Sequence, residues 1–74
     1  MINDNFYKYL GTNIKNRRKA LGLSQQALAD RVNLSLNFIG KIEVAFSKPS
    51  LETVIAIANA LDITVSELCY FKNI

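Results

Sequence analysis

The sequence contains no histidine and a single cysteine, Cys69. A zinc site needs several histidine or cysteine ligands, a disulfide within the chain needs two cysteines, and general acid–base catalysis most often uses histidine. The residues for these three kinds of chemistry are missing, so the sequence predicts no enzyme, no metal site and no cofactor. A lone cysteine usually packs as a small apolar side chain, and we expect Cys69 to be buried or half-buried on the last helix.

Long apolar runs are missing as well. The longest, residues 54–61, is interrupted by Asn59 and is far shorter than the roughly 20 residues that span a bilayer. The first ten residues contain an acid, Asp4, and no cationic region before an apolar segment, so they do not resemble a secretory signal. We therefore expect a soluble, cytoplasmic protein with no membrane partner, and no small-molecule ligand is evident.

Length and composition favour one folded domain over residues 1–74. A chain of 74 residues is long enough for a single compact domain and too short for two. Half of the residues are hydrophobic and 20% are charged, which is typical of a packed core rather than of disorder. No repeat, low-complexity tract or linker divides the chain, and its one proline, Pro49, lies between two apolar-periodic segments.

Positive charge is concentrated in the first two thirds of the chain. Residues 1–48 have eight Lys or Arg and three Asp or Glu, a net charge of +5, whereas residues 49–74 have a net charge of −2. A basic half of this kind can bind a polyanion such as DNA. A charge cluster such as residues 15–19 is also common on a solvated helix face, so charge alone leaves both interpretations open.

Apolar periodicity and N-cap residues together predict an all-α chain of five helices. In the first helix, Phe6, Leu10 and Ile14 recur at helical spacing, and Gly22 provides a left-handed exit. The later helices each follow a good N-cap residue, namely Ser24, Ser35, Ser50 and Thr64. Glu67 lies three residues after the last of these caps and completes a capping box. The predicted helices are 6–21, 25–32, 36–44, 51–61 and 65–71.

Residues 24–44 have the spacing of a helix-turn-helix motif. A first helix of about eight residues is followed by a turn of about three residues and a second helix. Two such helices can cross steeply only if the first has a small residue on its inner face and the turn has a residue that tolerates left-handed backbone geometry. Ala29 and Asn33 meet these two requirements.

The segments LGLSQQALADRV, NLSLNFIGKIE and KPSLETVIAIANALDITVSEL resemble the Cro and lambdoid-repressor type of helix-turn-helix protein, the XRE family of bacterial and phage regulators. The resemblance covers residues 10–70. It implies a compact five-helix, lambda-repressor-like DNA-binding domain. It also implies a transcriptional regulator, a repressor or controller, that inserts the second motif helix into the major groove of double-stranded DNA.

The resemblance further implies roles for individual residues. The residues expected to contact base edges are Leu36, Asn37, Gly40 and Lys41. Those expected to contact DNA phosphates are Ser24, Gln25, Ser35 and Lys48. Arg18 and Glu43 are expected to form a structural ion pair. The side chains suit base contact on their own chemistry, since asparagine can bridge adenine N6 and N7, lysine can donate to guanine, and leucine can lie against a thymine methyl. Ordinary exposure on a helix surface is the alternative.

Three positions depart from the family pattern. Asn33 occupies a turn position that is usually glycine, and asparagine is the next most tolerant of left-handed geometry. Gly40 lies inside the second motif helix, where it costs about 1 kcal/mol relative to alanine. Either the backbone there approaches DNA closely or the position makes no base contact. Phe46 places an apolar side chain in a loop where phosphate contacts are expected.

The chain ends with more apolar surface than so small a domain readily buries. The residues expected to form a homodimer interface through helix five are Leu68, Cys69, Tyr70, Phe71 and Ile74. A two-fold dimer would bind an inverted-repeat operator with half-site centres roughly 34 Å apart. An alternative function is an antitoxin-like or adaptor module that uses the helix-turn-helix fold mainly for contacts with protein.

Overall fold

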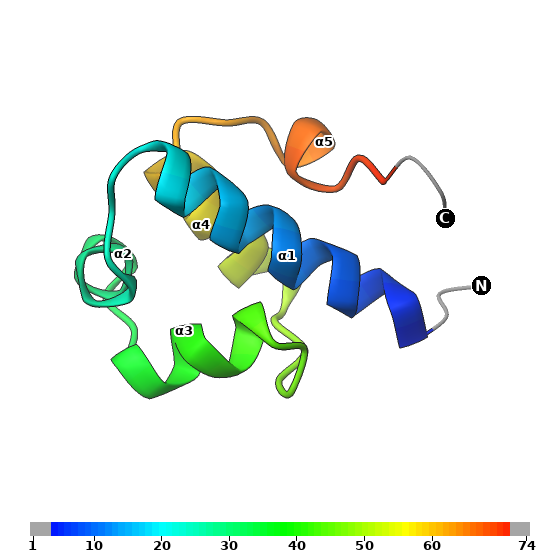
Figure 1. Cartoon of the computed structure of the whole chain (residues 1–74), viewed down its shortest axis with the longest axis horizontal. Helices are drawn as coiled ribbons and strands as arrows, with labels where there is room; N and C mark the ends of the chain where they lie inside the picture. Colours follow the sequence, from blue (N-terminus) through cyan, green and yellow to red (C-terminus); the bar gives the residue numbers. More distant parts are fainter. Residues whose placement is uncertain (1–3, 72–74) are drawn as a thin grey trace.

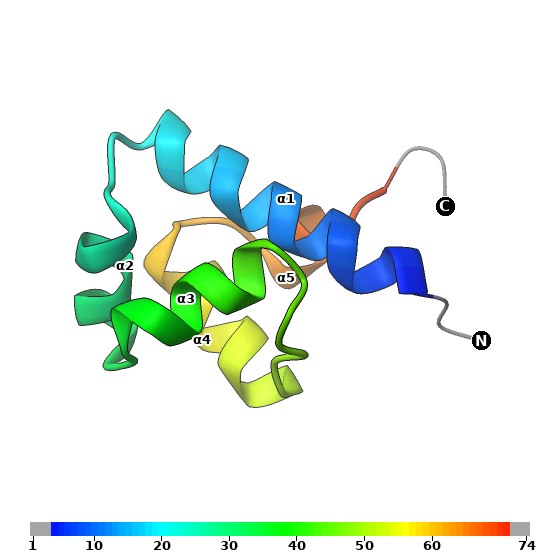
Figure 2. The same cartoon turned by 60° about the horizontal axis from the view of Figure 1, so that its bottom comes forward.

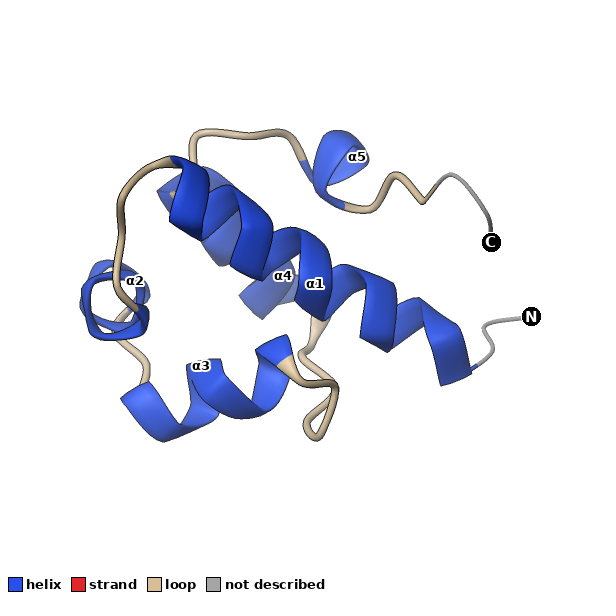
Figure 3. Cartoon of the chain, viewed as in Figure 1, coloured by secondary structure: helices blue, strands red, loops and turns tan. Residues whose placement is uncertain are grey.

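The computed structural model describes residues 4–71, which form five helices and, within that range, no strand (Figures 1 and 3). The helices are α1 (Asp4–Ala20), α2 (Gln25–Val32), α3 (Leu36–Glu43), α4 (Leu51–Ala60) and α5 (Val65–Leu68). The predicted all-α class and the five predicted helices are confirmed. None of the helices in residues 4–71 has the length and apolar character that a membrane span requires.

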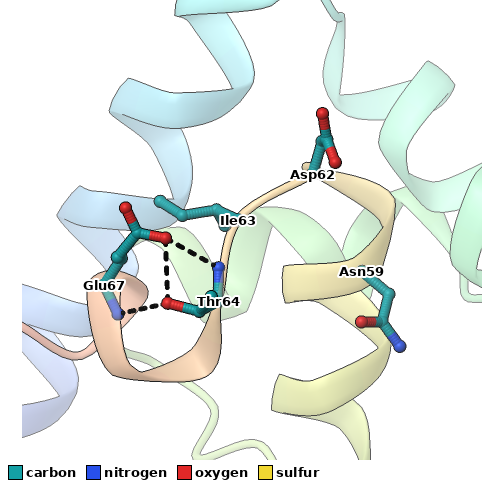
Figure 4. A pocket seen from close by; sticks show the side chains of 5 residues that line it. All are labelled: Asn59, Asp62, Ile63, Thr64 and Glu67. Atoms are coloured by element: carbon teal, nitrogen blue, oxygen red, sulfur yellow. Dashed lines mark hydrogen bonds between the residues drawn. The ribbon is translucent and has the colours of Figure 1, made fainter.

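Each of the last four helices begins at its predicted N-cap. The capping hydroxyl of Ser24, Ser35 or Ser50 accepts a hydrogen bond from the backbone N–H three residues later. At α5, the Thr64 hydroxyl accepts from the Glu67 N–H, and the Glu67 carboxylate accepts from the Thr64 N–H, as Figure 4 shows. The Thr64 backbone N–H and hydroxyl both donate to the Glu67 carboxylate, and these two hydrogen bonds lower the pKa of Glu67. The capping box is important locally because a four-residue helix is too short to be stable alone.

Helix α5 is shorter than predicted. It ends at Leu68 rather than at residue 71, and Cys69 is its C-cap. The reason is a contact from α1, where the Asn13 side-chain amide donates to the carbonyl oxygens of Leu68 at 2.8 Å and Tyr70 at 3.1 Å. A further helical turn would be needed to satisfy the Leu68 carbonyl within α5, and Asn13 satisfies it instead.

One core receives side chains from all five helices. The fully buried large residues are Leu10, Ile14, Leu28, Ile39, Ile42, Ile57, Leu61 and Leu68. Helix α3 packs against both α1 and α2, and α2 also packs against α4. Figure 2 shows α3 between α1 and α4, with one side turned toward the viewer. Burial of one side of α3 therefore determines which of its residues face outward.

Gly11 sets the distance between α1 and the end of α3. A Cβ atom at this position would lie 2.5 Å from the Ile42 carbonyl oxygen and 2.6 Å from the Glu43 carbonyl oxygen. No side chain fits at such distances, so only glycine allows the two helices to approach this closely. No sequence signal identifies Gly11, because its role depends on a partner about thirty positions away.

Left-handed backbone geometry occurs in the described residues at two predicted positions and at two unpredicted ones. Gly22 has φ 72° just after α1, as predicted. Asn33 has φ 57° and ends α2, as its place in the motif predicts. Ala45 (φ 63°) and Asp62 (φ 54°) also lie in this region. Alanine rarely adopts this conformation, yet the loop after α3 turns tightly at Ala45, where no glycine is present. Residues 45–50 then lead to the N-cap of α4.

Candidate nucleic-acid interface

A buried ion pair joins α1 to the end of α3. The Arg18 guanidinium donates from Nε to Glu43 Oε2 at 2.7 Å and from Nη2 to Glu43 Oε1 at 3.0 Å. The two residues are 6% and 5% exposed, and the hydrogen bonds to Glu43 raise the pKa of Arg18. Arg18 also donates to the Leu23 carbonyl oxygen at 2.8 Å. The expected pair is therefore present, and it ties both α1 and the segment before α2 to α3.

Gln25 has a structural contact that sequence patterns do not indicate. Its side-chain amide donates to Glu43 Oε1 at 3.0 Å, so the first residue of α2 joins the same network as Arg18 and Glu43. Gln25 was expected to contact phosphate, and its Nε2 group is already engaged within the chain. Its backbone N–H lies at the N-terminus of α2. The N–H groups at a helix N-terminus have no partner within the helix and can donate to an anion that binds there.

The four predicted base-contacting residues lie on one outward side of α3. They line a single surface depression together with residues from neighbouring segments: Gln25, Leu36, Asn37, Gly40, Lys41, Val44 and Phe46. Leu36, Gly40 and Val44 recur every four residues and form an apolar stripe, while Asn37 and Lys41 form a polar stripe beside it. Ile39, Ile42 and Glu43 occupy the buried side. The depression can therefore contact both apolar and hydrogen-bonding groups.

Gly40 has open space above it. An added Cβ atom would meet the Gln25 side-chain amide at 3.9 and 4.0 Å, which is ordinary van der Waals distance. Packing within the described chain therefore does not require glycine here, in contrast to Gly11. An approaching molecule can come closer to the helix backbone at Gly40 than at any position with a side chain.

The predicted phosphate-contacting serines lie at exposed helix starts. Ser24 begins α2 and Ser35 begins α3, and both side chains are exposed. A capping hydroxyl uses its oxygen as an acceptor, so its own O–H can still donate to an anion. The amides at a helix N-terminus and the partial positive charge of the helix dipole also favour anions.

Two lysines near α3 lie over aromatic rings. Lys41 Nζ is 5.7 Å from the ring centroid of Phe46, and Lys48 Nζ is 5.5 Å from that of Tyr7. Both distances are within the range of cation–π attraction. Phe46 is 77% exposed, so the apolar residue of the loop after α3 faces outward beside the predicted base-contacting lysine.

Part of the basic character of α1 is structural. Arg17 donates to the carbonyl oxygens of Leu61 at 2.9 Å and Asp62 at 3.1 Å, where it satisfies groups at the end of α4. Arg18 is buried in its pair with Glu43. Within the cluster 15–19, Lys15 and Lys19 are left exposed. The charge count therefore overstates the cationic surface that α1 presents.

The predicted dimer residues are partly used inside the chain. Leu68 is 1% exposed and belongs to the core, which corrects its assignment to a contact surface. Phe71 is half-buried, with its ring centroid 5.4 Å from that of Phe6 and 5.7 Å from that of Tyr9. Phe71 packs on α1 because α5 ends at Leu68, so that the residues just after it return toward that helix.

Other members of the predicted dimer set remain accessible to different degrees. Tyr70 is 67% exposed. Cys69 is half-buried, as expected, and burial raises the pKa of its thiol. Ile74 lies outside the described residues. Two apolar residues of α4 that were not predicted, Leu51 (68%) and Ile55 (42%), are also exposed.

The chain matches a known family model over most of its length. Residues 14–68 match the family described as Helix-turn-helix (HTH_3). Cryptic phage CTXphi transcriptional repressor RstR of Vibrio cholerae is 38% identical over 56 residues, which are 76% of this chain and 50% of that protein. The immunity repressor protein of Bacillus phage phi105 is 42% identical over 59 residues, which are 80% of this chain and 41% of that protein. The chain thus matches about half the length, or less, of these two relatives.

A solved structure extends the similarity to the whole fold. The restriction-modification controller protein C.AhdI from Aeromonas hydrophila superimposes with a TM-score of 0.81 at 34% sequence identity. The match covers 84% of this chain and 94% of that chain. The resemblance inferred from the sequence motifs is confirmed, and this chain belongs to the helix-turn-helix family HTH_3.

Proposed function

We propose that this chain is a sequence-specific DNA-binding transcriptional regulator that places α3 in the major groove. The observation that supports this most directly is the single outward surface formed by Leu36, Asn37, Gly40 and Lys41. A short exposed helix of a helix-turn-helix motif fits the major groove. The relatives support the same function, since they are named as two repressors and a controller, and none as an enzyme.

The two stripes of α3 have different roles in this proposal. Asn37 can form two hydrogen bonds with an adenine, and Lys41 can donate to guanine O6 and N7. Leu36 can lie against a thymine methyl. The buried pair of Arg18 and Glu43 contacts no base and holds α3 at a defined angle to α1. The preference for a DNA sequence then depends on residues of the outer side of α3, and the orientation of α3 depends on residues of its inner side.

Phosphate contacts flank the base-contacting surface. Ser24, Ser35 and the backbone N–H of Gln25 lie at two helix starts that favour anions. Lys48 provides a positive charge in the segment between α3 and α4. Contacts of this kind position a protein on the duplex and carry no base information.

We further propose that the protein acts as a homodimer on an inverted repeat. Tyr70, Leu51 and Ile55 present exposed apolar surface on or near the packed pair of α4 and α5. Pairing of two copies through this surface would cover it and would give a two-fold axis. Half-site centres would lie roughly 34 Å apart, one turn of the DNA helix.

Selection of bound sites from random duplexes tests this function. The expected result is one preferred sequence with two-fold symmetry, bound with an affinity that falls as salt concentration rises, because neutralised phosphates release counterions. A strict monomer on an asymmetric site would contradict the dimer and leave the DNA-binding function in place. Failure to select any sequence would favour the alternative, a module that contacts protein.

A further inference from the structure

A gap interrupts the apolar stripe on the outer side of α3. Leu36 and Val44 lie one turn before and one turn after Gly40 and are 45% and 73% exposed. Gly40 lies between them without a side chain, and all three line the same depression as Phe46. The stripe therefore consists of two apolar walls with a space of one residue between them, which we call the Gly40 notch.

The notch has room for about one methyl group. An alanine Cβ at Gly40 would lie no closer than 3.9 Å to the nearest neighbouring side-chain atom, Gln25 Nε2. The space that such a methyl would take is therefore open and faces outward. Glycine within a helix is less stable than alanine, and packing in the described chain does not account for its presence here.

The chemistry of the notch matches one feature of the major groove. Thymine presents a C5 methyl group there, whereas the other base edges present hydrogen-bonding atoms. The polar group nearest the notch is the Gln25 amide, whose Nε2 already donates to Glu43 Oε1. A polar base edge placed between Leu36 and Val44 would therefore lose water and meet mainly apolar side chains, which is unfavourable. A methyl group placed there loses water favourably and meets apolar side chains on two sides.

We propose that Gly40 is a specificity-determining residue whose notch holds the C5 methyl group of a thymine in each half-site. This inference rests on the proposed function and goes beyond it by naming the base and the group that is recognised. Gly40 acts through the absence of a side chain, and Leu36 and Val44 supply the apolar contacts. Lys41 and Asn37 on the adjacent stripe contact the neighbouring base edges.

Replacement of single thymines by deoxyuridine tests the inference, since it removes only the C5 methyl group. Using the full chain and its selected site, we expect a loss of affinity of roughly fourfold at one position per half-site, the equivalent of one buried methyl-sized group. Gly40→Ala fills the notch with its own methyl group. This variant should bind the thymine site more weakly than the wild type and should bind the deoxyuridine site more tightly than its own thymine site.

The inference has a folding control and a matched variant. Gly40→Ala should unfold at a higher temperature than the wild type, so weaker binding to the thymine site would not reflect a damaged fold. Val44→Ala shortens one wall of the notch and should reduce the deoxyuridine penalty without reversing the preference.

Two results would overturn the inference while the proposed function stands. One is equal affinity of the wild type for thymine and deoxyuridine at every position of a specifically bound site. The other is a Gly40→Ala variant that keeps the wild-type preference for thymine. If the wild type selects no sequence at all, the proposed function fails first, and the notch inference fails with it.

Discussion

The inner and outer sides of α3 differ in what holds their residues in place. On the inner side, the Glu43 carboxylate accepts hydrogen bonds from Arg18 and Gln25, and the backbone near Ile42 touches Gly11. On the outer side, Asn37 and Leu36 are exposed, and space is open above Gly40. The residues that orient α3 and the residues proposed to contact DNA bases therefore lie on opposite sides of the helix, about half a turn apart. Substitutions on the two sides should change different measurable quantities.

The largest effect is expected from Glu43→Ala on the inner side. This change leaves the buried Arg18 charge without its partner and removes the acceptor of Gln25. Breaking a buried pair in this way costs about 3 to 5 kcal/mol of unfolding free energy. Thermal or denaturant unfolding measures this loss of unfolding free energy. Glu52 is exposed, so Glu52→Ala serves as a control whose stability should change little. An unchanged melting temperature for Glu43→Ala would contradict the role of the pair.

The same substitution at two glycines should have opposite effects on stability. Gly11→Ala places a methyl group 2.5 Å from the Ile42 carbonyl oxygen, and such overpacking costs about 1 to 3 kcal/mol. Gly40→Ala meets open space and should gain about 1 kcal/mol from helix propensity. Urea unfolding of both variants checks the contrast. Equal shifts of the same sign would mean that the two sides of α3 are not packed as described.

Substitutions of the two polar outer-side residues, Asn37 and Lys41, should change recognition and leave stability nearly unaltered. Asn37→Ala or Lys41→Ala should cost about 1 to 3 kcal/mol of binding free energy on the preferred site, because a bidentate contact to a base is lost. Binding to unrelated duplexes should fall less. Titration of both variants against preferred and mutated sites measures this. An unaltered preference in both would exclude these two side chains as base contacts.

Lys48→Ala should have a smaller and sequence-independent effect. Loss of one phosphate contact should weaken binding to all duplexes by a similar factor and lower the salt slope by about one unit. Removal of the charge also ends the interaction of Lys48 with the Tyr7 ring. Affinities measured over a series of salt concentrations give the slope. A slope equal to that of the wild type would show that Lys48 neutralises no phosphate.

The smallest effect concerns the capping box of α5, which lies away from α3. Hydrogen bonds from Thr64 lower the pKa of Glu67 below its ordinary value of 4.5. The ionised carboxylate therefore adds stability above that value, and this contribution is lost as the pH falls through the lowered pKa. Glu67→Gln should lower the melting temperature at pH 7 and lose this difference in strong acid. A difference that stays constant with pH would contradict the role of the charge.

Local features were predictable because their causes lie close together in the chain. The four N-caps and the capping box each involve residues three positions apart. The left-handed turn at Asn33 follows from the conformational tolerance of one residue. The outward position of Leu36, Asn37, Gly40 and Lys41 was implied by a resemblance to a known family rather than by their spacing alone.

Several contacts of the structure have no local signal. Gln25 meets Glu43 across 18 positions, Arg17 meets the Leu61 carbonyl across 44, and Asn13 meets the Tyr70 carbonyl across 57. Arg17 and Asn13 each look like an ordinary polar residue on a helix surface. Sequence patterns therefore overestimated the free charge of α1 and extended α5 beyond its end at Leu68.

The sequence by itself determined the helix starts and the turn at Asn33, because each depends on residues within about one helical turn. The tertiary structure decided the opposite roles of Gly11 and Gly40, the engagement of Gln25 with Glu43 and the burial of Leu68. The physical reason is that the space around a residue, and the groups that satisfy its polar atoms, come from segments far along the chain that meet only after folding.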